Sequence, residues 1–150
     1  LCEHTAEIAQ QNDVLDQSYK EILNASNKMR TVIGSSALNA FIQTTKLDHV
    51  VWKADVYSVI FNTSSKSVDD FARHTDCRLG HWYYQGDGQQ YSHHSAFKAL
   101  EEPHKRVHAH GIEAMLSAKN GECHDARLAL QQMEEASLEV YRHLSSLEDK

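Results

Sequence analysis

The spacing of apolar side chains most constrains how this chain can fold, because they recur every three or four residues along most of its length. In the first segment this spacing forms a heptad pattern with two interleaved series. One series is Ile8, Leu15, Ile22 and Met29, and the other is Asn12, Tyr19, Ser26 and Ile33. Such a pattern predicts a coiled-coil helix, although an amphipathic core helix would explain it equally well.

The sequence Gly34-Ser35-Ser36 loosens this pattern, and a second helical face then runs from Leu38 to about Phe61. It consists of Leu38, Phe41, Ile42, Thr45, His49, Trp52, Val56 and Ile60. Residues 1–35 are therefore expected to form a coiled-coil-like helix. Residues 36–150 are expected to form a helical bundle.

The middle of the chain is less regular. Ser67 could cap a short helix through Arg73, because its hydroxyl can accept a hydrogen bond from a free backbone N–H. The run from Asp76 to Gly88, which includes Cys77, combines three glycines with three aromatic residues. Such a composition disfavours a regular helix and indicates a structured loop, entered from a helical turn.

Helical spacing resumes near Ser92, and Pro103 either begins a new helix or kinks the existing one. The sequence Asn120-Gly121 predicts a stop, and the apolar spacing continues from Glu122 to the end. No strand pair is recognisable. The predicted fold is all-α, a four-helix bundle with a short extra helix in the connection around Cys77.

The composition argues against several classes of function. The 150 residues carry 15 Lys and Arg against 21 Asp and Glu, a net charge of −6. Without a basic tract, binding to nucleic acid or to an anionic membrane surface is disfavoured. The chain has three cysteines, Cys2, Cys77 and Cys123. This number is small and odd, whereas a disulfide framework uses many cysteines in pairs, so a reducing cytoplasm is favoured. The start at Leu1, with no secretory leader, suggests a fragment of a longer protein.

Among the 11 histidines, His104 and His108 are the first candidates for metal ligands. Residues four apart project from the same face of a helix, one turn apart. His49 lies on the apolar face of another helix, where an imidazole without a partner would lose its hydrogen bonds. Cys77 offers a thiol. Three His and one Cys form a donor set that suits tetrahedral zinc, although each residue alone is more often a structural one.

Three blocks of the sequence together resemble the chemoreceptor zinc-binding domain of bacterial chemoreceptors and diguanylate cyclases. They are Leu47-Asp-His49-Val-Val-Trp-Lys53, Cys77-Arg-Leu-Gly80-His-Trp82-Tyr-Tyr-Gln-Gly86, and Phe97-Lys-Ala-Leu100 followed by Pro103-His104-Lys-Arg-Val107-His108. The resemblance covers roughly residues 41–111 in order and spacing. Three ordered blocks are far more specific than any one of them.

The resemblance implies a cytoplasmic, homodimeric helical bundle that binds one zinc ion per subunit through His49, Cys77, His104 and His108. It also implies control of an attached signalling output domain, most simply in a chemoreceptor, by zinc or by oxidants such as hypochlorous acid acting on zinc-bound Cys77. Four protein ligands leave no open position for water, so the site is expected to be regulatory and the chain not an enzyme.

We expect Cys77 to be the mobile ligand, because it alone lies on a glycine-flanked segment, whereas the three histidines lie on predicted helices. Asp48, Trp52 and Lys53 are candidates to pack around the ligands, whereas Cys2 and Cys123 are expected to be incidental. His81, His93, His94 and His110 are expected to be bystanders.

Two alternatives remain open from the residues. A carboxylate-bridged di-iron bundle needs two Glu-x-x-His motifs, of which Glu101-Glu-Pro-His104 supplies one. A metal-free coiled-coil interaction module would make the histidines irrelevant.

Overall fold

The computed structural model describes residues 2–148, and the side chains of residues 2–10 and 12 are not described. The order of elements is α1, η1, α2, η2, α3 and α4, and no strand occurs among the described residues. The chain divides into two compact units, residues 1–39 and residues 40–150. The all-α helical bundle predicted from the apolar spacing is confirmed.

Helix α1 (Cys2–Ile60) passes through Gly34 without interruption. In the first unit nearly all described side chains are exposed, including the apolar members of the heptad pattern. Their exposed fractions are 68% for Leu15, 65% for Ile22 and 62% for Met29. A single exposed helix cannot bury these side chains itself, so their apolar surface stays unpaired within this unit. Ile8 and Asn12 belong to the same pattern but lie outside the described side chains.

Between α1 and α3 the chain forms three short elements. The η1 turn (Val68–Asp70) is capped at Ser67, whose backbone N–H donates to the Asp70 carboxylate at 2.7 Å. Ser67 is the predicted N-cap residue, but its hydroxyl donates to the same carboxylate at 2.9 Å, and the helix after it lasts one turn and ends before Arg73. Helix α2 (Arg78–Tyr84) begins directly after Cys77, and η2 (Asp87–Tyr91) follows. The short extra helix predicted around Cys77 is therefore present as α2, although most of the glycine-rich run was expected to form a structured loop.

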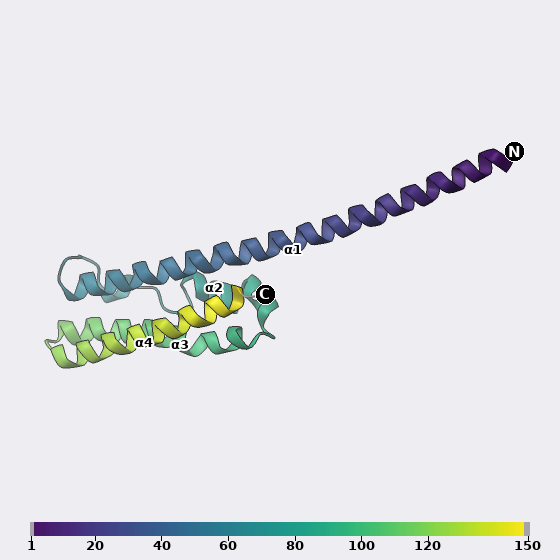
Figure 1. Ribbon diagram of the computed structural model, residues 1–150. Helices are drawn as coiled ribbons and strands as arrows, with labels where there is room; N and C mark the ends of the chain where they lie inside the picture. Colours follow the sequence, from purple (N-terminus) through teal and green to yellow (C-terminus); the bar gives the residue numbers. More distant parts are fainter. Residues whose placement is uncertain (1, 149–150) are drawn as a thin grey trace. The chain divides into compact units, whose positions relative to one another are not determined.

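Helices α3 (Ser95–Lys119) and α4 (Cys123–Glu148) lie side by side in Figure 1. Pro103 sits inside α3, so it neither begins a new helix nor ends one. The turn between the helices falls where it was predicted: Asn120 is the last cap of α3 and Gly121 has φ of +80°, a conformation that favours glycine.

The core of the second unit is built from the buried faces of all four α-helices. Its fully buried members are Ile42, Val56, Leu79, Leu100, Val107, Met115, Met133, Leu144 and Leu147. Polar contacts join α1 to α4 along the edge of this core. Lys53 pairs with Glu134 at 2.5 Å, and Lys46 Nζ lies 2.9 Å from Ser145 Oγ. These contacts hold the C-terminal part of α1, which carries His49, against the rest of the bundle.

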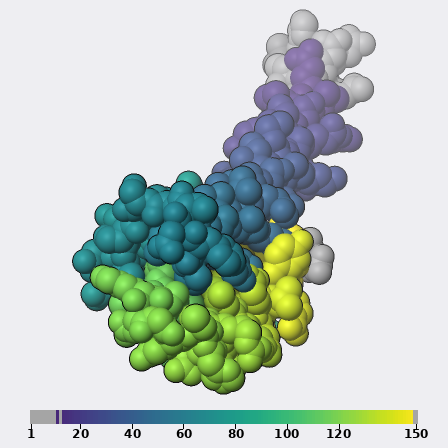
Figure 2. Space-filling view, turned by 90° about the vertical axis from the view of Figure 1, so that its left-hand side faces the viewer, coloured from purple at the N-terminus to yellow at the C-terminus, as the bar shows by residue number. Residues whose placement is uncertain are grey.

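Figure 2 shows the end of the bundle where the segment after α1 meets the turn between α3 and α4. A groove at this end is lined by Val59, Ile60, Asn62, Ser64, Lys66, Ser67, Val68, Asp69, Met115, Leu116, Ala118 and Lys119. Among the helices that the structure describes, none combines the length and the apolar character that crossing a membrane requires.

Candidate metal centre

Four predicted ligand residues from three helical elements come together inside the second unit. His49 lies on α1, Cys77 is the residue that caps the start of α2, and His104 and His108 lie one turn apart on α3. Their donor atoms, three ring nitrogens and one sulfur, all lie within 4.8 Å of one another. Three of the side chains are buried and Cys77 is half-buried.

Backbone carbonyls orient two of the imidazole rings. His49 Nδ1 lies 2.8 Å from the carbonyl oxygen of Thr45, and His108 Nδ1 lies 2.9 Å from that of Ala72. A carbonyl only accepts hydrogen bonds, so the Nδ1 atom of each ring carries the proton and donates it. The Nε2 atom of each neutral ring is then left with a free lone pair.

These Nε2 atoms supply the strongest evidence that the site fits a metal ion. In the part of the chain that the structure describes, Nε2 of His49 and Nε2 of His108 are buried and have no hydrogen-bond partner. Leaving a buried acceptor unsatisfied costs about 1–3 kcal/mol. A bound cation would satisfy both lone pairs at once.

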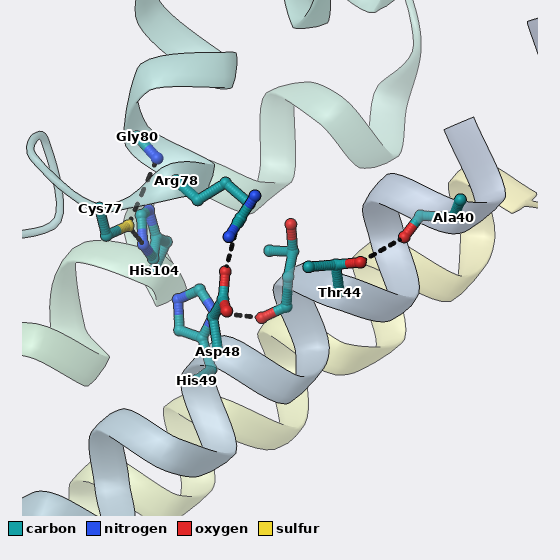
Figure 3. A network of polar contacts seen from close by, with 9 residues as sticks. Ala40, Thr44, Asp48, His49, Cys77, Arg78, Gly80 and His104 are labelled. Atoms are coloured by element: carbon teal, nitrogen blue, oxygen red, sulfur yellow. Dashed lines mark hydrogen bonds and ion pairs between the residues drawn. The ribbon is translucent and has the colours of Figure 1, made fainter. Parts of the chain in front are cut away.

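Cys77 completes the cluster from the start of α2, as Figure 3 shows. Its Sγ lies 3.2 Å from Nε2 of His104 and accepts a hydrogen bond from the Gly80 backbone N–H at 3.4 Å. The thiol also contacts the carbonyl oxygen of His74 at 3.6 Å. Cys77 is therefore both the N-cap of a helix and a neighbour of the imidazole cluster.

Gly80 allows the backbone before Cys77 to approach α2 very closely. A Cβ atom at this position would lie 2.0 Å from the carbonyl oxygen of His74 and 2.7 Å from that of Thr75. Real Cβ atoms do not approach backbone atoms so closely, so only glycine fits here. The turn that ends at Cys77 is thus held directly against the helix that follows it.

Burial sets the protonation of the cluster. Burial, followed by the proximity of His49, lowers the pKa of His108 to about 4. Burial, followed by the other imidazoles, lowers the pKa of His104 to about 2, and burial also lowers the pKa of His49. The pKa of the Cys77 thiol is raised by burial, against the opposing effect of backbone hydrogen bonds at the start of α2. At neutral pH the cluster therefore holds three neutral imidazoles and one neutral thiol.

The donor set matches zinc in chemistry and in size. Zinc takes imidazole nitrogen and thiolate sulfur at about 2.0–2.3 Å, so donors around one tetrahedral ion lie about 3–4 Å apart. In the cluster the sulfur of Cys77 is already 3.2 Å from Nε2 of His104 and all donor pairs lie within 4.8 Å, so only small side-chain movements are needed. Neutral imidazole is also the form in which histidine binds a metal.

An ion pair and a pocket lie beside the cluster. Arg78 Nε lies 2.6 Å from Asp48 Oδ2, which links the residue after Cys77 to the residue before His49 (Figure 3). A pocket of about 240 Å³ reaches Cys77. It is lined by Asp48, His49, Trp52, Cys77, Arg78, Leu79 and His108. A small molecule therefore has a route to the sulfur.

Of the other residues predicted to pack around the ligands, Trp52 does so and Lys53 does not. The Trp52 ring lies 4.5 Å from the ring of His108, centroid to centroid, so it packs against the cluster. Lys53 instead forms its ion pair with Glu134 on α4. Cys123 is exposed at the start of α4, and the side chain of Cys2 lies outside the described residues.

The four bystander histidines lie outside the cluster. His81 and His93 are exposed, His94 caps the start of α3, and His110 pairs with Glu113 at 3.0 Å.

One histidine that sequence reasoning missed lies beside the cluster. The centroid of the His74 ring is 6.0 Å from that of His104 and 6.3 Å from that of Tyr84. His74 has no histidine four residues away, so no helical spacing marks it.

The di-iron alternative finds no support in the arrangement of carboxylates. Glu101 is exposed and accepts a hydrogen bond from the Tyr84 hydroxyl at 3.0 Å. Among the described residues, the cluster that could hold a metal consists of histidines and one cysteine, without a carboxylate. Bridged iron pairs are held mainly by carboxylates.

Comparison with known families agrees with this arrangement. Residues 49–115 match the family model of the chemoreceptor zinc-binding domain, and this range includes all four residues of the cluster. The family identified from the three sequence blocks is thereby confirmed for this part of the chain, and zinc is the metal that its domain binds. No curated protein and no solved structure matches the chain.

Proposed function

We propose that this chain is the regulatory zinc-binding sensor region of a cytoplasmic bacterial signalling protein, most simply a chemoreceptor. In this proposal His49, Cys77, His104 and His108 bind zinc, and Cys77 also senses oxidants. The observation that supports it best is the pair of buried, unpartnered Nε2 atoms in a cluster whose four donors lie within 4.8 Å. The match to a zinc-binding family over the same residues agrees with it.

The proposed role is regulatory because of the ligand count. Four protein donors satisfy tetrahedral zinc and leave no position for an activated water molecule, which hydrolytic zinc sites require. Bound zinc would keep the Cys77 sulfur as a thiolate at neutral pH, although burial raises the pKa of the free thiol. Thiolate character is what makes a cysteine sulfur a nucleophile toward oxidants.

The oxidant reaction is a two-electron oxidation of this sulfur. The Cys77 thiolate attacks the chlorine of hypochlorous acid, forming an S–Cl bond and releasing hydroxide. Water then displaces chloride, so Cys77 becomes a sulfenic acid, and one proton and one chloride ion are released. The pocket of about 240 Å³ beside Cys77 gives a small oxidant access to the sulfur.

Oxidation would act on helix packing because the ligands come from different elements. His49 belongs to α1, Cys77 to the start of α2, and the other two ligands to α3. Losing Cys77 as a ligand would remove one of the links between α2 and helices α1 and α3. A shared ion that can lose one ligand is the kind of two-state element that a switch needs. The attached output domain would respond to that change.

Metal analysis of the purified chain tests the zinc site. We expect one zinc per chain in the wild type, and weaker binding with no response to hypochlorous acid in Cys77→Ser. Cys123→Ser is the matched control, because Cys123 is exposed and outside the cluster, and it should behave like the wild type. A wild-type chain without zinc, whose stability is unchanged by a chelator, would favour the metal-free coiled-coil module instead.

A homodimer is the second part of the proposal. The exposed apolar members of the heptad pattern, such as Leu15 and Ile22, support it, because identical a/d faces on two copies can bury each other. Sedimentation of the wild type should give twice the chain mass, and Ile22→Asp should shift the equilibrium toward the monomer. A wild type that sediments as a monomer at high concentration would contradict the homodimer.

A further inference from the structure

His74 is placed on the same side of the cluster as Cys77. It lies three residues before Cys77, and its carbonyl oxygen contacts the Cys77 sulfur at 3.6 Å. Both residues also approach His104: the Cys77 sulfur lies 3.2 Å from Nε2 of that residue, and the His74 ring lies edge-on to its ring. His74 and Cys77 therefore reach the same ligand from one turn of the backbone.

The distance between the ring centroids of His74 and His104 is close to the distances between the rings within the cluster. Ring centroids are 4.9 Å apart for His104 and His108, 5.1 Å for His49 and His104, and 5.7 Å for His49 and His108. The ring of His74 lies 6.0 Å from that of His104. This separation exceeds the largest one inside the cluster by only 6.0 − 5.7 = 0.3 Å.

No hydrogen bond fixes the His74 side chain, whereas its backbone is held. The ring is half-buried, and neither of its nitrogens has a hydrogen-bond partner among the described residues. Its carbonyl group, by contrast, lies against Gly80 with no room for a Cβ atom between them. Rotation about the side-chain bonds can thus change the position of the ring without moving the backbone turn.

From these positions we infer that His74 is a reserve zinc ligand, which takes the place of Cys77 when the thiolate no longer binds. The inference rests on the zinc site proposed above and adds a fifth donor to it. The exchange needs no redox step of its own: a neutral imidazole lone pair replaces the sulfur lone pair on the ion. The domain would then keep its zinc after Cys77 is oxidised, held by four imidazoles.

Zinc affinity of four variants tests this inference, with competition by a chelator of known affinity as the measurement. Cys77→Ala should bind one zinc at least tenfold more tightly than Cys77→Ala/His74→Ala. In the wild-type background, His74→Ala should change the affinity less than threefold, because Cys77 occupies the fourth position. Cys77→Ala/His81→Ala is the matched control, since His81 is exposed on α2, and it should equal Cys77→Ala.

Side-chain ¹H–¹⁵N spectra of Cys77→Ala provide a second measurement that does not depend on the double variant folding. Zinc should shift the ring nitrogens of four histidines, including His74, rather than three. Equal affinities for Cys77→Ala and Cys77→Ala/His74→Ala, or an unshifted His74, would overturn the inference while leaving the zinc site intact. Absence of zinc binding by the wild type would overturn both.

Discussion

Zinc binding should release one proton from the chain, and the number follows from the protonation of the cluster. The pKa values of all three imidazoles are lowered by burial, to about 2 for His104 and about 4 for His108, so these rings carry no proton that zinc must displace. The pKa of the Cys77 thiol is raised by burial, so this group is protonated before binding. Only the thiol has a proton to lose.

The number of protons released differs most from the number expected for ordinary imidazoles in mildly acidic solution. At pH 6 a histidine with a pKa of about 6.5 is about three-quarters protonated, so three such rings and a thiol would together release about three protons. With the pKa values of His104 and His108 lowered to about 2 and about 4, these two rings are neutral at pH 6, so the release stays closer to one proton than to three. Because binding removes the thiol proton, zinc affinity should rise about tenfold for each pH unit between neutral pH and the pKa of the thiol.

Calorimetry in buffers of different ionisation enthalpy measures this number directly, since the apparent binding heat varies linearly with the buffer and the slope is the proton count. Cys77→Ala should lower the count at pH 6, because the thiol proton is then absent. A release of about three protons by the wild type at pH 6 would refute the burial argument. A release near zero would mean that the thiol is ionised before zinc arrives.

Three substitutions test the packing around the cluster. Gly80→Ala places a methyl group 2.0 Å from the carbonyl oxygen of His74, so we expect a loss of about 1–3 kcal/mol in urea unfolding and at least tenfold weaker zinc binding, measured by chelator competition; wild-type behaviour of this variant would contradict the close approach. Arg78→Ala removes the ion pair with Asp48, whose side chains are 56% and 41% exposed, so the free energy of unfolding should fall by less than about 1 kcal/mol. A larger loss would show that the pair does more than join two exposed groups. Met133→Ala removes most of a fully buried side chain and should lower the free energy of unfolding by about 2–5 kcal/mol in the same urea assay. An unchanged free energy of unfolding would show that the core is not packed around this residue.

The long helices could be predicted from the sequence because local signals and tertiary packing agree there. The apolar spacing of α3 and α4 marks the faces that are buried, and Asn120-Gly121 marks the turn because Gly121 adopts positive φ. Of the two alternatives for Pro103, the structure excludes a helix that begins there, because the proline lies buried inside α3, next to His104. Burial of this part of α3 outweighs the missing backbone hydrogen bond.

The short helix predicted around Cys77 is present as α2, but its bounds could not be predicted, because its glycines indicated a loop. Gly80 is buried inside the helix, and its role is to admit the backbone of residues 74 and 75. That contact is tertiary, so no helix propensity reveals it. His74 was missed for the same reason, because a turn of the chain, rather than helical spacing, brings it to His104.

The separation of the cluster residues along the chain bears on when zinc can act during folding. Cys77 and His104 are 27 residues apart, and Ala72, whose carbonyl orients His108, is 36 residues from that ring. Such long-range contacts form late, because closing a long segment costs entropy before the contacts can stabilise it. A complete site is therefore expected only near the native state, so bound zinc should lengthen the lifetime of the folded domain and leave its folding rate almost unchanged.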